Sequence, residues 1–389
     1  GFIDGSFRMS GITEKLTFLS NLNIKDVFLN KEKLGNINLM ANWNAVKSSI
    51  YIDANVVRDD KKVIDLTGNY YLLNDDDNLR FNLFVNDFDL NVISPFVSTV
   101  ISEVKGGING VLSISGTPNK PVIEGGIGFK DAGCRVNYLN NYYTFSHVVN
   151  LSRNLIKFEN LRLTDVNNNT AVANGTITHD YLKNFVFDIN IDCYNFFALN
   201  IPEEKANGFY GTAVADGVVS IKGPLNDIKM DINAITKKGT EIDIPLTNTE
   251  VVNDDFIVFV YNGENQSDTV AVAATEPVKK QNFTMNLNAD VNPAANVRIS
   301  LPMNIGVITA NGNGNLRMGY KSGDLSLIGD YMISEGEFVF TIQNLIKMDF
   351  VLRGGTITWS GDITDADIDV VGSYRTNALI SSLGIETDS

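Results

Sequence analysis

Two histidines are the residues with the widest catalytic use in this 389-residue chain, and neither stands in a catalytic motif. His147 and His179 do not belong to an HExxH or other metal-ligand spacing, and no Ser or Cys motif lies beside them. Both lie near turn-forming residues, so we expect surface or turn roles for them. The sequence therefore favours a protein that is not an enzyme and uses no cofactor.

Two other segments resemble ligand-binding loops in part. Gly312–Gly319 is rich in glycine, but no Lys-Ser/Thr pair follows it, so we interpret it as a turn. Asp365, Asp367 and Asp369 alternate as in a calcium loop. However, the sixth and twelfth positions hold Val and Thr, where a calcium loop needs Gly and Glu. We expect a strand with one solvated face here and no metal site.

Cys134 and Cys193 are the two cysteines of the chain. They could form one bridge in an oxidising compartment, but their spacing is not that of a zinc site. Cys193 continues an alternation of apolar residues, which predicts a place on the apolar face of a strand. The alternating residues are Phe185, Phe187, Ile189 and Ile191.

The charge balance excludes one class of partner. Asp and Glu total 46 against 31 Lys and Arg, giving a formal charge of -15, which repels the phosphates of nucleic acids. Apolar residues make up 44% of the chain, enough for a core, but the longest apolar run is too short to cross a bilayer. The chain starts Gly-Phe-Ile-Asp-Gly, without an initiator Met or signal-peptide pattern, so we expect a fragment of a longer protein.

Apolar and polar residues alternate with period two in several segments, including 79–85, 185–191, 228–234 and 285–291. This alternation is typical of antiparallel strands with one apolar and one polar face. Helix is scarce. The best candidate is Ser94–Lys105, with Ser94 as N-cap, Pro95 in the first turn and an apolar stripe after it.

An internal repeat of about 100 residues organises the chain. The motifs that begin at Gly5, Gly110 and Gly217 are 105 and 107 residues apart. Pro95, Pro202 and Pro302 keep a similar spacing, at 107 and 100 residues. A period of this length fits either a string of immunoglobulin-like sandwiches or one continuous sheet to which each repeat adds strands.

The continuous sheet is the better interpretation, because no Pro- or Ser-rich linker separates the repeats and the two Trp residues do not repeat. We predict an all-β fold: an elongated, continuous antiparallel sheet with one or two short helices. The first β-repeat is expected at 1–105, ending in the helix 94–105, and is continuous with a second region at 106–389.

Several motifs resemble one known family over roughly residues 106–376. The most specific are Phe338–Ile342, Gly354–Asp362, Ala366–Val370 and Tyr374–Thr376, and others are Gly116–Val122 with Gly125–Phe129, Asn174–His179 with Asn184–Asp188, and Phe209–Ala213 with Ile221–Pro224. These stretches resemble the C-terminal region of the TamB translocation and assembly module family of Gram-negative bacteria, particularly its Bacteroidetes-like members.

The resemblance implies that the antiparallel sheet is curled and forms a long open trough with an apolar interior. It implies a periplasmic protein that is anchored in the inner membrane by a segment absent from this sequence. It implies shielding of phospholipid acyl chains during transport between the two membranes. It also implies assembly or secretion of outer-membrane proteins with an Omp85-type barrel partner. An edge strand lent to nascent barrel proteins is a related possibility. An adhesin or stalk of tandem sandwiches is the alternative from another class.

We expect the groove to be lined by apolar residues of the alternating strands, which in the alternative interpretation form a sealed core. These residues are Phe81, Leu83, Phe185, Phe187, Ile189, Ile191, Met230, Ile232, Met285, Leu287, Phe338, Phe340, Ile357 and Trp359.

Overall fold

The computed structural model describes residues 2–10, 17–29, 32–98, 101–206, 208–246, 282–321, 324–342 and 346–375. It is 80% strand and 4% helix. Its 21 strands belong to one sheet, which is mostly antiparallel. The all-β, continuous-sheet prediction is therefore confirmed, and the tandem-sandwich architecture is wrong, because a sandwich needs two facing sheets in each repeat.

The chain divides into two compact units. Unit 1 comprises Gly1–Phe196, Val218–Asp231 and Asp255–Thr284, and unit 2 comprises Phe197–Gly217, Ile232–Asp254 and Met285–Ser389. The strands that begin in unit 1 are β1 (Phe2–Ser10), β2 (Thr17–Leu29), β3 (Glu32–Asn44), β4 (Ser49–Arg58), β5 (Lys61–Tyr71), β6 (Leu79–Asp89), β7 (Ile101–Thr117), β8 (Lys120–Val136), β9 (Asn141–Ser152), β10 (Leu155–Thr164), β11 (Thr170–Asp180), β12 (Lys183–Ile201), β14 (Asp227–Thr236) and β16 (Asn282–Val291).

The remaining strands begin in unit 2, and four short helical segments join strands along the chain. The strands are β13 (Tyr210–Pro224), β15 (Glu241–Pro245), β17 (Asn296–Ser300), β18 (Gly306–Lys321), β19 (Asp324–Ile342), β20 (Ile346–Asp362) and β21 (Ala366–Ser373). The helical segments are η1 (Leu90–Ile93), α1 (Ser94–Val97), η2 (Glu203–Lys205) and η3 (Pro302–Asn304).

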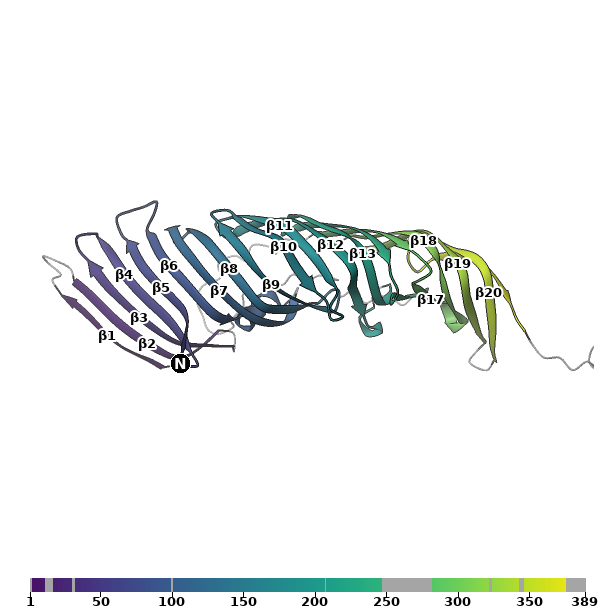
Figure 1. Cartoon of the computed structure of the whole chain (residues 1–389), viewed down its shortest axis with the longest axis horizontal. Helices are drawn as coiled ribbons and strands as arrows, with labels where there is room; N and C mark the ends of the chain where they lie inside the picture. Colours follow the sequence, from purple (N-terminus) through teal and green to yellow (C-terminus); the bar gives the residue numbers. More distant parts are fainter. Residues whose placement is uncertain are drawn as a thin grey trace, which may run out of the picture. The chain divides into compact units, whose positions relative to one another are not determined.

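Unit 1 is built on an antiparallel meander of β1 to β12, in which strands that follow one another in the chain pair, from β1 with β2 to β11 with β12 (Figure 1). Short turns explain this order, because they can join only neighbouring antiparallel strands. The alternation of apolar and polar residues then fixes the register that keeps the apolar side chains of each strand on one face. Residue 105 lies inside β7, which pairs with both β6 and β8.

The predicted helix over 94–105 is mostly wrong. Only Ser94–Val97 is α-helical, and Ile101 already begins β7 and pairs with Val136 of β8. The apolar stripe on which the prediction rested contains β-branched residues, which also suit a strand, and pairing with β8 decides the outcome. Leu90 and Val92 of the preceding η1 are buried, so this segment does cover part of the sheet.

Four strands of unit 1 carry the same kind of β-bulge. The register shifts at Asp26 in β2, Asp87 in β6, Asp131 in β8 and Asn160 in β10. Each of these residues has a positive φ, and its N–H donates to a side-chain oxygen of the following strand at 2.7–2.9 Å. The four acceptors are Asn36, Asn109, Ser146 and Asn174. Bulges bend a strand and increase its twist, so these four, on β2, β6, β8 and β10, curl the sheet of unit 1.

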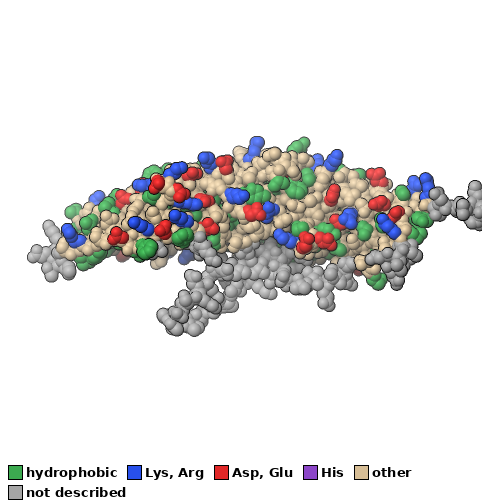
Figure 2. Space-filling model, turned by 90° about the horizontal axis from the view of Figure 1, so that it is seen from below, with side chains coloured by type: hydrophobic (Ala, Val, Ile, Leu, Met, Phe, Trp, Pro, Cys, Tyr) green, Lys and Arg blue, Asp and Glu red, His purple; other side chains and the backbone are tan. Residues whose placement is uncertain are grey.

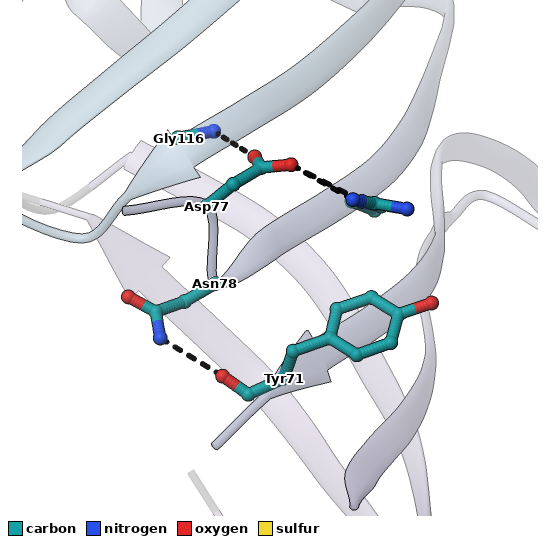
Figure 3. A network of polar contacts seen from close by, with 5 residues as sticks. Tyr71, Asp77, Asn78 and Gly116 are labelled. Carbon is teal, nitrogen blue, oxygen red and sulfur yellow. Dashed lines mark hydrogen bonds and ion pairs between the residues drawn. The ribbon is translucent and has the colours of Figure 1, made fainter. Parts of the chain in front are cut away.

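The turn between β5 and β6 is tied to β7 by one aspartate (Figure 3). Asp77 accepts the N–H of Gly116 at 2.9 Å and the Arg80 guanidinium at 3.1 and 3.2 Å. The Gly116 N–H lowers the pKa of Asp77 most, and Arg80 lowers it further while desolvation opposes them. Asn78 donates to the Tyr71 carbonyl at 2.9 Å, which closes the same turn.

Unit 2 differs from unit 1 in having a large buried core. β13 pairs with β15, β15 runs parallel to β17, and β17 to β21 continue through β18, β19 and β20 in antiparallel pairs. The buried core includes Ile299, Ile308, Tyr331, Ile357 and Trp359. The Tyr331 hydroxyl donates to the Ala310 carbonyl at 2.9 Å, and the Trp359 indole N–H donates to the Ile363 carbonyl at 3.1 Å, so both polar groups are satisfied inside the core.

The sequence repeat corresponds to recurring strand positions. Gly5, Gly110 and Gly217 lie in β1, β7 and β13, so the first two periods each span six strands. Pro95 lies in α1 after β6, Pro302 lies in η3 after β17, and Pro202 precedes η2 after β12. Each stretch of strands thus ends in a short turn of helix at a proline.

Candidate functional site

One apolar row crosses all twelve meander strands of unit 1. Cross-strand pairing aligns one residue from each strand, and every residue in this central row is aliphatic, aromatic or glycine. From β1 to β12 the central row is Gly5, Leu22, Leu39, Ala54, Leu66, Leu83, Leu112, Gly125, Leu151, Ile156, Ile177 and Phe187. At ~4.8 Å per strand the row is about 50 Å long.

The glycine at β8 shows how tightly the backbone is held along this row. Gly125 has a φ of +138°, and an added Cβ would lie 2.2 Å from the Val111 carbonyl oxygen. Any side chain at this position forces the β7–β8 pair apart. The cross-strand pairing therefore continues through Gly125, although this residue adds no side chain to the apolar face.

A second apolar row runs beside the central row on the same face. This neighbouring row is Ile3, Ile24, Ile37, Val56, Ile64, Val85, Gly110, Ile127 and Val149. Most side chains of the two rows are half-buried, with Leu112, Val56 and Val149 buried. Since all described strands belong to one sheet, no second sheet of described strands covers this apolar face.

The opposite face of β1 to β5 is polar, whereas β6 and β7 continue the same row with Phe84 and Val111, which are exposed. The intervening row starts Asp4, Asn23, Asn38, Asn55 and Asp65 in successive strands. Asn23 donates to Asn38 at 2.6 Å, and Asn38 donates to Asn55 at 3.0 Å. This amide ladder links the polar side chains of β2 to β4 across the strands, although Asn23 Oδ1 itself accepts no hydrogen bond. The half-buried apolar rows on the other face still need a partner.

Side-chain contacts show that the sheet of unit 1 curls toward its apolar face. Tyr143 of β9 and Phe196 of β12 stack with ring centroids 5.0 Å apart, and both are buried. Three strand spacings separate β9 from β12, roughly 14 Å in a flat sheet. The contact therefore requires strong curvature at this end of the strands, which encloses the apolar face as a groove.

The apolar face of unit 1 carries little charge. Burial raises the pKa of the Cys134 thiol and of the Tyr143 hydroxyl, so both are uncharged at neutral pH. Cys134 and Cys193 are both half-buried and neither forms a disulfide, and the predicted place of Cys193 on an apolar strand face is confirmed by its pairing with Ala171. The two apolar rows themselves contain no charged residue.

The structure places the predicted lining residues in two environments. Those in unit 1 belong to β6, β12 and β14. Phe81 is buried, and the others are half-buried: Leu83, Phe185, Phe187, Ile189, Ile191 and Met230. Leu83 and Phe187 lie on the central row itself. The pairing thus brings the unit 1 members of β6 and β12 onto one apolar face.

In unit 2 the predicted residues have several environments, and of them only Phe338, Ile357 and Trp359 lie against or inside the core. Ile232, Leu287, Phe338 and Phe340 are half-buried and Met285 is buried. Ile357 and Trp359 are only 0% and 1% exposed and belong to the core cluster, so they offer no surface in this structure. Phe338 packs against that core and stacks on Phe350 at 5.9 Å.

The remaining candidates for chemistry have structural roles. His147 lies in the middle of β9, opposite Phe129, so its expected place near a turn is wrong, although it is half-exposed. The alternation Phe145, His147, Val149 explains its place on the apolar face. His179 fits the turn prediction, since its Nδ1 accepts the Leu182 N–H at 3.1 Å. Asp365, Asp367 and Asp369 are exposed at β21, as expected for its solvated face.

The glycine-rich segment at 312–319 is part of strand β18 and not the turn expected from the sequence, because its residues pair with β19 along their whole length. Within the described part of the chain, no group of three or more His, Cys, Asp or Glu is placed to hold a metal ion. The same residues include no helix of the length and apolarity needed to cross a membrane.

Most of the central row was not singled out from the sequence. Leu22, Leu39, Leu66 and Leu151 belong to segments with the same alternation, so extending the period-two pattern finds them. The Tyr143–Phe196 stack has no such signal, because it joins residues 53 positions apart through the curl of the sheet.

Fold and site together define a class: a β-sheet protein whose single sheet presents a long, uncharged apolar face inside a curled groove. The chain belongs to the TamB family, because the family model described as the TamB C-terminal domain matches residues 159–389, more than half of the 389-residue chain. Comparison with curated proteins and with solved structures found no match.

Membership of this family places the chain among envelope proteins of the translocation and assembly module. The family acts in outer-membrane biogenesis or lipid transport, is not enzymatic, and works with Omp85-type partners in general.

Proposed function

We propose that the groove of unit 1 shields phospholipid acyl chains in the periplasm during their transport between the inner and outer membranes. The observation that carries this proposal is the central row: twelve strands contribute twelve uncharged positions in unbroken register, and most of the side chains are half-buried. A sealed core of the kind formed around Trp359 in unit 2 leaves no such surface.

The free energy of acyl-chain hydration favours transport along an apolar surface. An acyl chain of 16 carbons costs roughly 12 kcal/mol to hold in water at ~0.8 kcal/mol per CH₂. An apolar row about 50 Å long offsets most of that cost at any point along it. Because leucine and isoleucine recur from strand to strand, successive positions offer similar contacts. A lipid can therefore move along the row without a deep trap.

The lining extends in this proposal to the other half-buried residues of β12 in unit 1, Phe185, Ile189 and Ile191. The same proposal takes an Omp85-type outer-membrane barrel as the partner of the full-length protein, in keeping with the family. A role in outer-membrane protein assembly with that partner is compatible with lipid transport.

The test is the lipid content of the purified protein. The chain expressed in a Gram-negative periplasm and purified without detergent is expected to carry phospholipid detectable by mass spectrometry. Leu83→Asp places a charge on the central row and is expected to abolish that signal. Asn82→Asp adds the same charge one residue away on the exposed opposite face, and should leave it unchanged. A folded parent protein without phospholipid contradicts the proposal.

A further inference from the structure

Three hairpin turns at one end of the unit 1 strands each carry an exposed cation. The β7–β8, β9–β10 and β11–β12 connections contribute Lys120, Arg153 and Lys183. In an antiparallel meander alternate turns lie at the same end of the strands. The turns at the other end of this stretch, 137–140 and 165–169, contain no Lys or Arg. These three turns therefore carry a cluster of cations at one rim, whereas Arg135, which contacts the 137–140 turn at the other end, is paired with Glu103.

Curvature gathers these turns together. The Lys120 ammonium lies 5.9 Å from the centroid of the Tyr181 ring, within the range of a cation–π contact. Lys120 begins β8 and Tyr181 follows β11, so a flat sheet would separate them by roughly 14 Å. The turn of Arg153 lies between them, and its Asn154 carbonyl accepts the His179 N–H at 3.0 Å.

The three cations lack the carboxylate partners found elsewhere. Ten other Lys and Arg side chains form ion pairs within 4.0 Å. Over the face seen in Figure 2, side chains of both signs are interspersed. Among described residues none of Lys120, Arg153 and Lys183 has such a pair. With the exposed Asp180 beside them, these three turns carry three positive charges and one negative, a net of +2, on a chain of net charge -15. The neighbouring β5–β6 turn at the same end is acidic, with Asp75, Asp76 and Asp77.

The rim lies close to the central row. Leu151 is two residues from Arg153, and Phe187 is four residues from Lys183. Gly125 is five residues from Lys120. At ~3.3 Å per residue, the row therefore runs about 7–17 Å from the turns. An amphiphile with its acyl chain on the central row extends its polar end to this rim.

We propose that Lys120, Arg153 and Lys183 bind the phosphate of a phospholipid headgroup whose acyl chains lie on the central row. This inference rests on the proposed function and adds to it a binding site for the headgroup. Ammonium and guanidinium groups are the usual protein ligands of phosphate, and the Tyr181 ring beside Lys120 suits the boundary between acyl chain and headgroup. The rim thereby orients the lipid across the groove.

The test compares two lipids with identical acyl chains, phosphatidylglycerol and diacylglycerol, of which only the first has a phosphate. The triple variant Lys120→Gln/Arg153→Gln/Lys183→Gln is expected to bind phosphatidylglycerol about tenfold more weakly at low salt, since three exposed ion pairs of modest strength are lost. Its binding of diacylglycerol should not change.

The control Lys33→Gln/Lys62→Gln/Lys157→Gln removes three exposed cations from other positions of unit 1, and is expected to bind both lipids like the parent. Lys120→Arg/Lys183→Arg should retain phosphatidylglycerol.

Several results overturn the inference. Unchanged phosphatidylglycerol binding by the triple variant, an equal loss of diacylglycerol binding, or an equal loss in the control each contradicts a phosphate site at this rim. Inorganic phosphate alone is expected to bind only at millimolar concentration, and tight binding without lipid indicates a site for free phosphate instead. A parent protein that binds neither lipid contradicts the proposed function itself, a result distinct from failure at the rim alone.

Discussion

Aspartate substitutions at Phe187 and Ile357 are expected to separate an open groove from a sealed core. Both residues lie on apolar faces of long strands, but Phe187 is half-buried on the central row and Ile357 is 0% exposed in the unit 2 core. Full burial of such a side chain contributes about 1.5–3 kcal/mol. Phe187→Asp therefore loses about half of that, and its carboxylate still reaches water, so we expect a cost of about 1–2 kcal/mol.

Ile357→Asp loses the whole burial term and also leaves a carboxylate unpaired inside the core. Burying an unpaired polar group costs roughly 2–7 kcal/mol, so the total exceeds about 4 kcal/mol and unfolds unit 2. The two tryptophans report the units separately. Trp43 of β3 lies in unit 1 and Trp359 of β20 lies in unit 2. Urea unfolding followed by fluorescence measures Phe187→Asp in a Trp359→Phe background and Ile357→Asp in a Trp43→Phe background.

The lipid measurement completes this comparison. Phe187→Asp should stay folded and lose bound phospholipid, because a charge now stands on the row. If Phe187→Asp destabilises unit 1 as strongly as Ile357→Asp destabilises unit 2, the apolar face of unit 1 is a sealed core and the reasoning fails. Asp188→Asn, on the opposite face of β12, is the control and should change neither property.

Two further predictions concern the local structures that shape unit 1. Asn109→Ala removes the acceptor of the Asp87 N–H and should lower the free energy of unfolding in urea by about 0.5–1 kcal/mol. Asn109→Asp keeps an acceptor and should lower it less. Equal losses in the two variants would refute a role of this hydrogen bond in stabilising the bulge. Asp77 has a lowered pKa, so its stabilising effect is present above the pKa of the unfolded chain and is lost as the pH falls through the folded pKa. Asp77→Asn should therefore lower the urea midpoint at pH 7, with a difference that shrinks below about pH 4; a difference that persists unchanged in acid contradicts this account.

The faces of the strands could be predicted from the sequence because the period-two pattern is a local property of the pleat. The residues of 185–191 alternate in the sequence and in exposure, and Asp367 and Asp369 are exposed as expected. Pairing partners follow from the order of the strands along the chain, since short turns join neighbours. These two features are enough to derive an antiparallel sheet with one apolar face.

Curvature and closure could not be predicted in the same way. The alternation around Phe187 resembles that around Ile357, yet one residue is half-buried and the other is fully enclosed. The difference depends on how far each sheet region bends, which is set by bulges such as that at Asp87 and by contacts such as Tyr143–Phe196. Such contacts join strands that are not neighbours, so no local pattern reports them.

The helix predicted over 94–105 failed for a related reason. Ile101 and Val104 satisfy a helical stripe and a strand equally well, and Ile101 pairs with β8 in the structure. Tertiary pairing overrides local propensity where β-branched residues allow both conformations.

Photo-crosslinking along the central row tests the central claim most directly. A benzophenone amino acid placed at Leu22, Leu83 or Phe187 samples the start, middle and end of the row, and Asn23, Asn82 and Asp188 provide positions on the opposite face. We predict phospholipid adducts from all three row positions and none from the opposite face. Adducts from neither face, or equal yields from both, would contradict a continuous acyl-chain groove in unit 1.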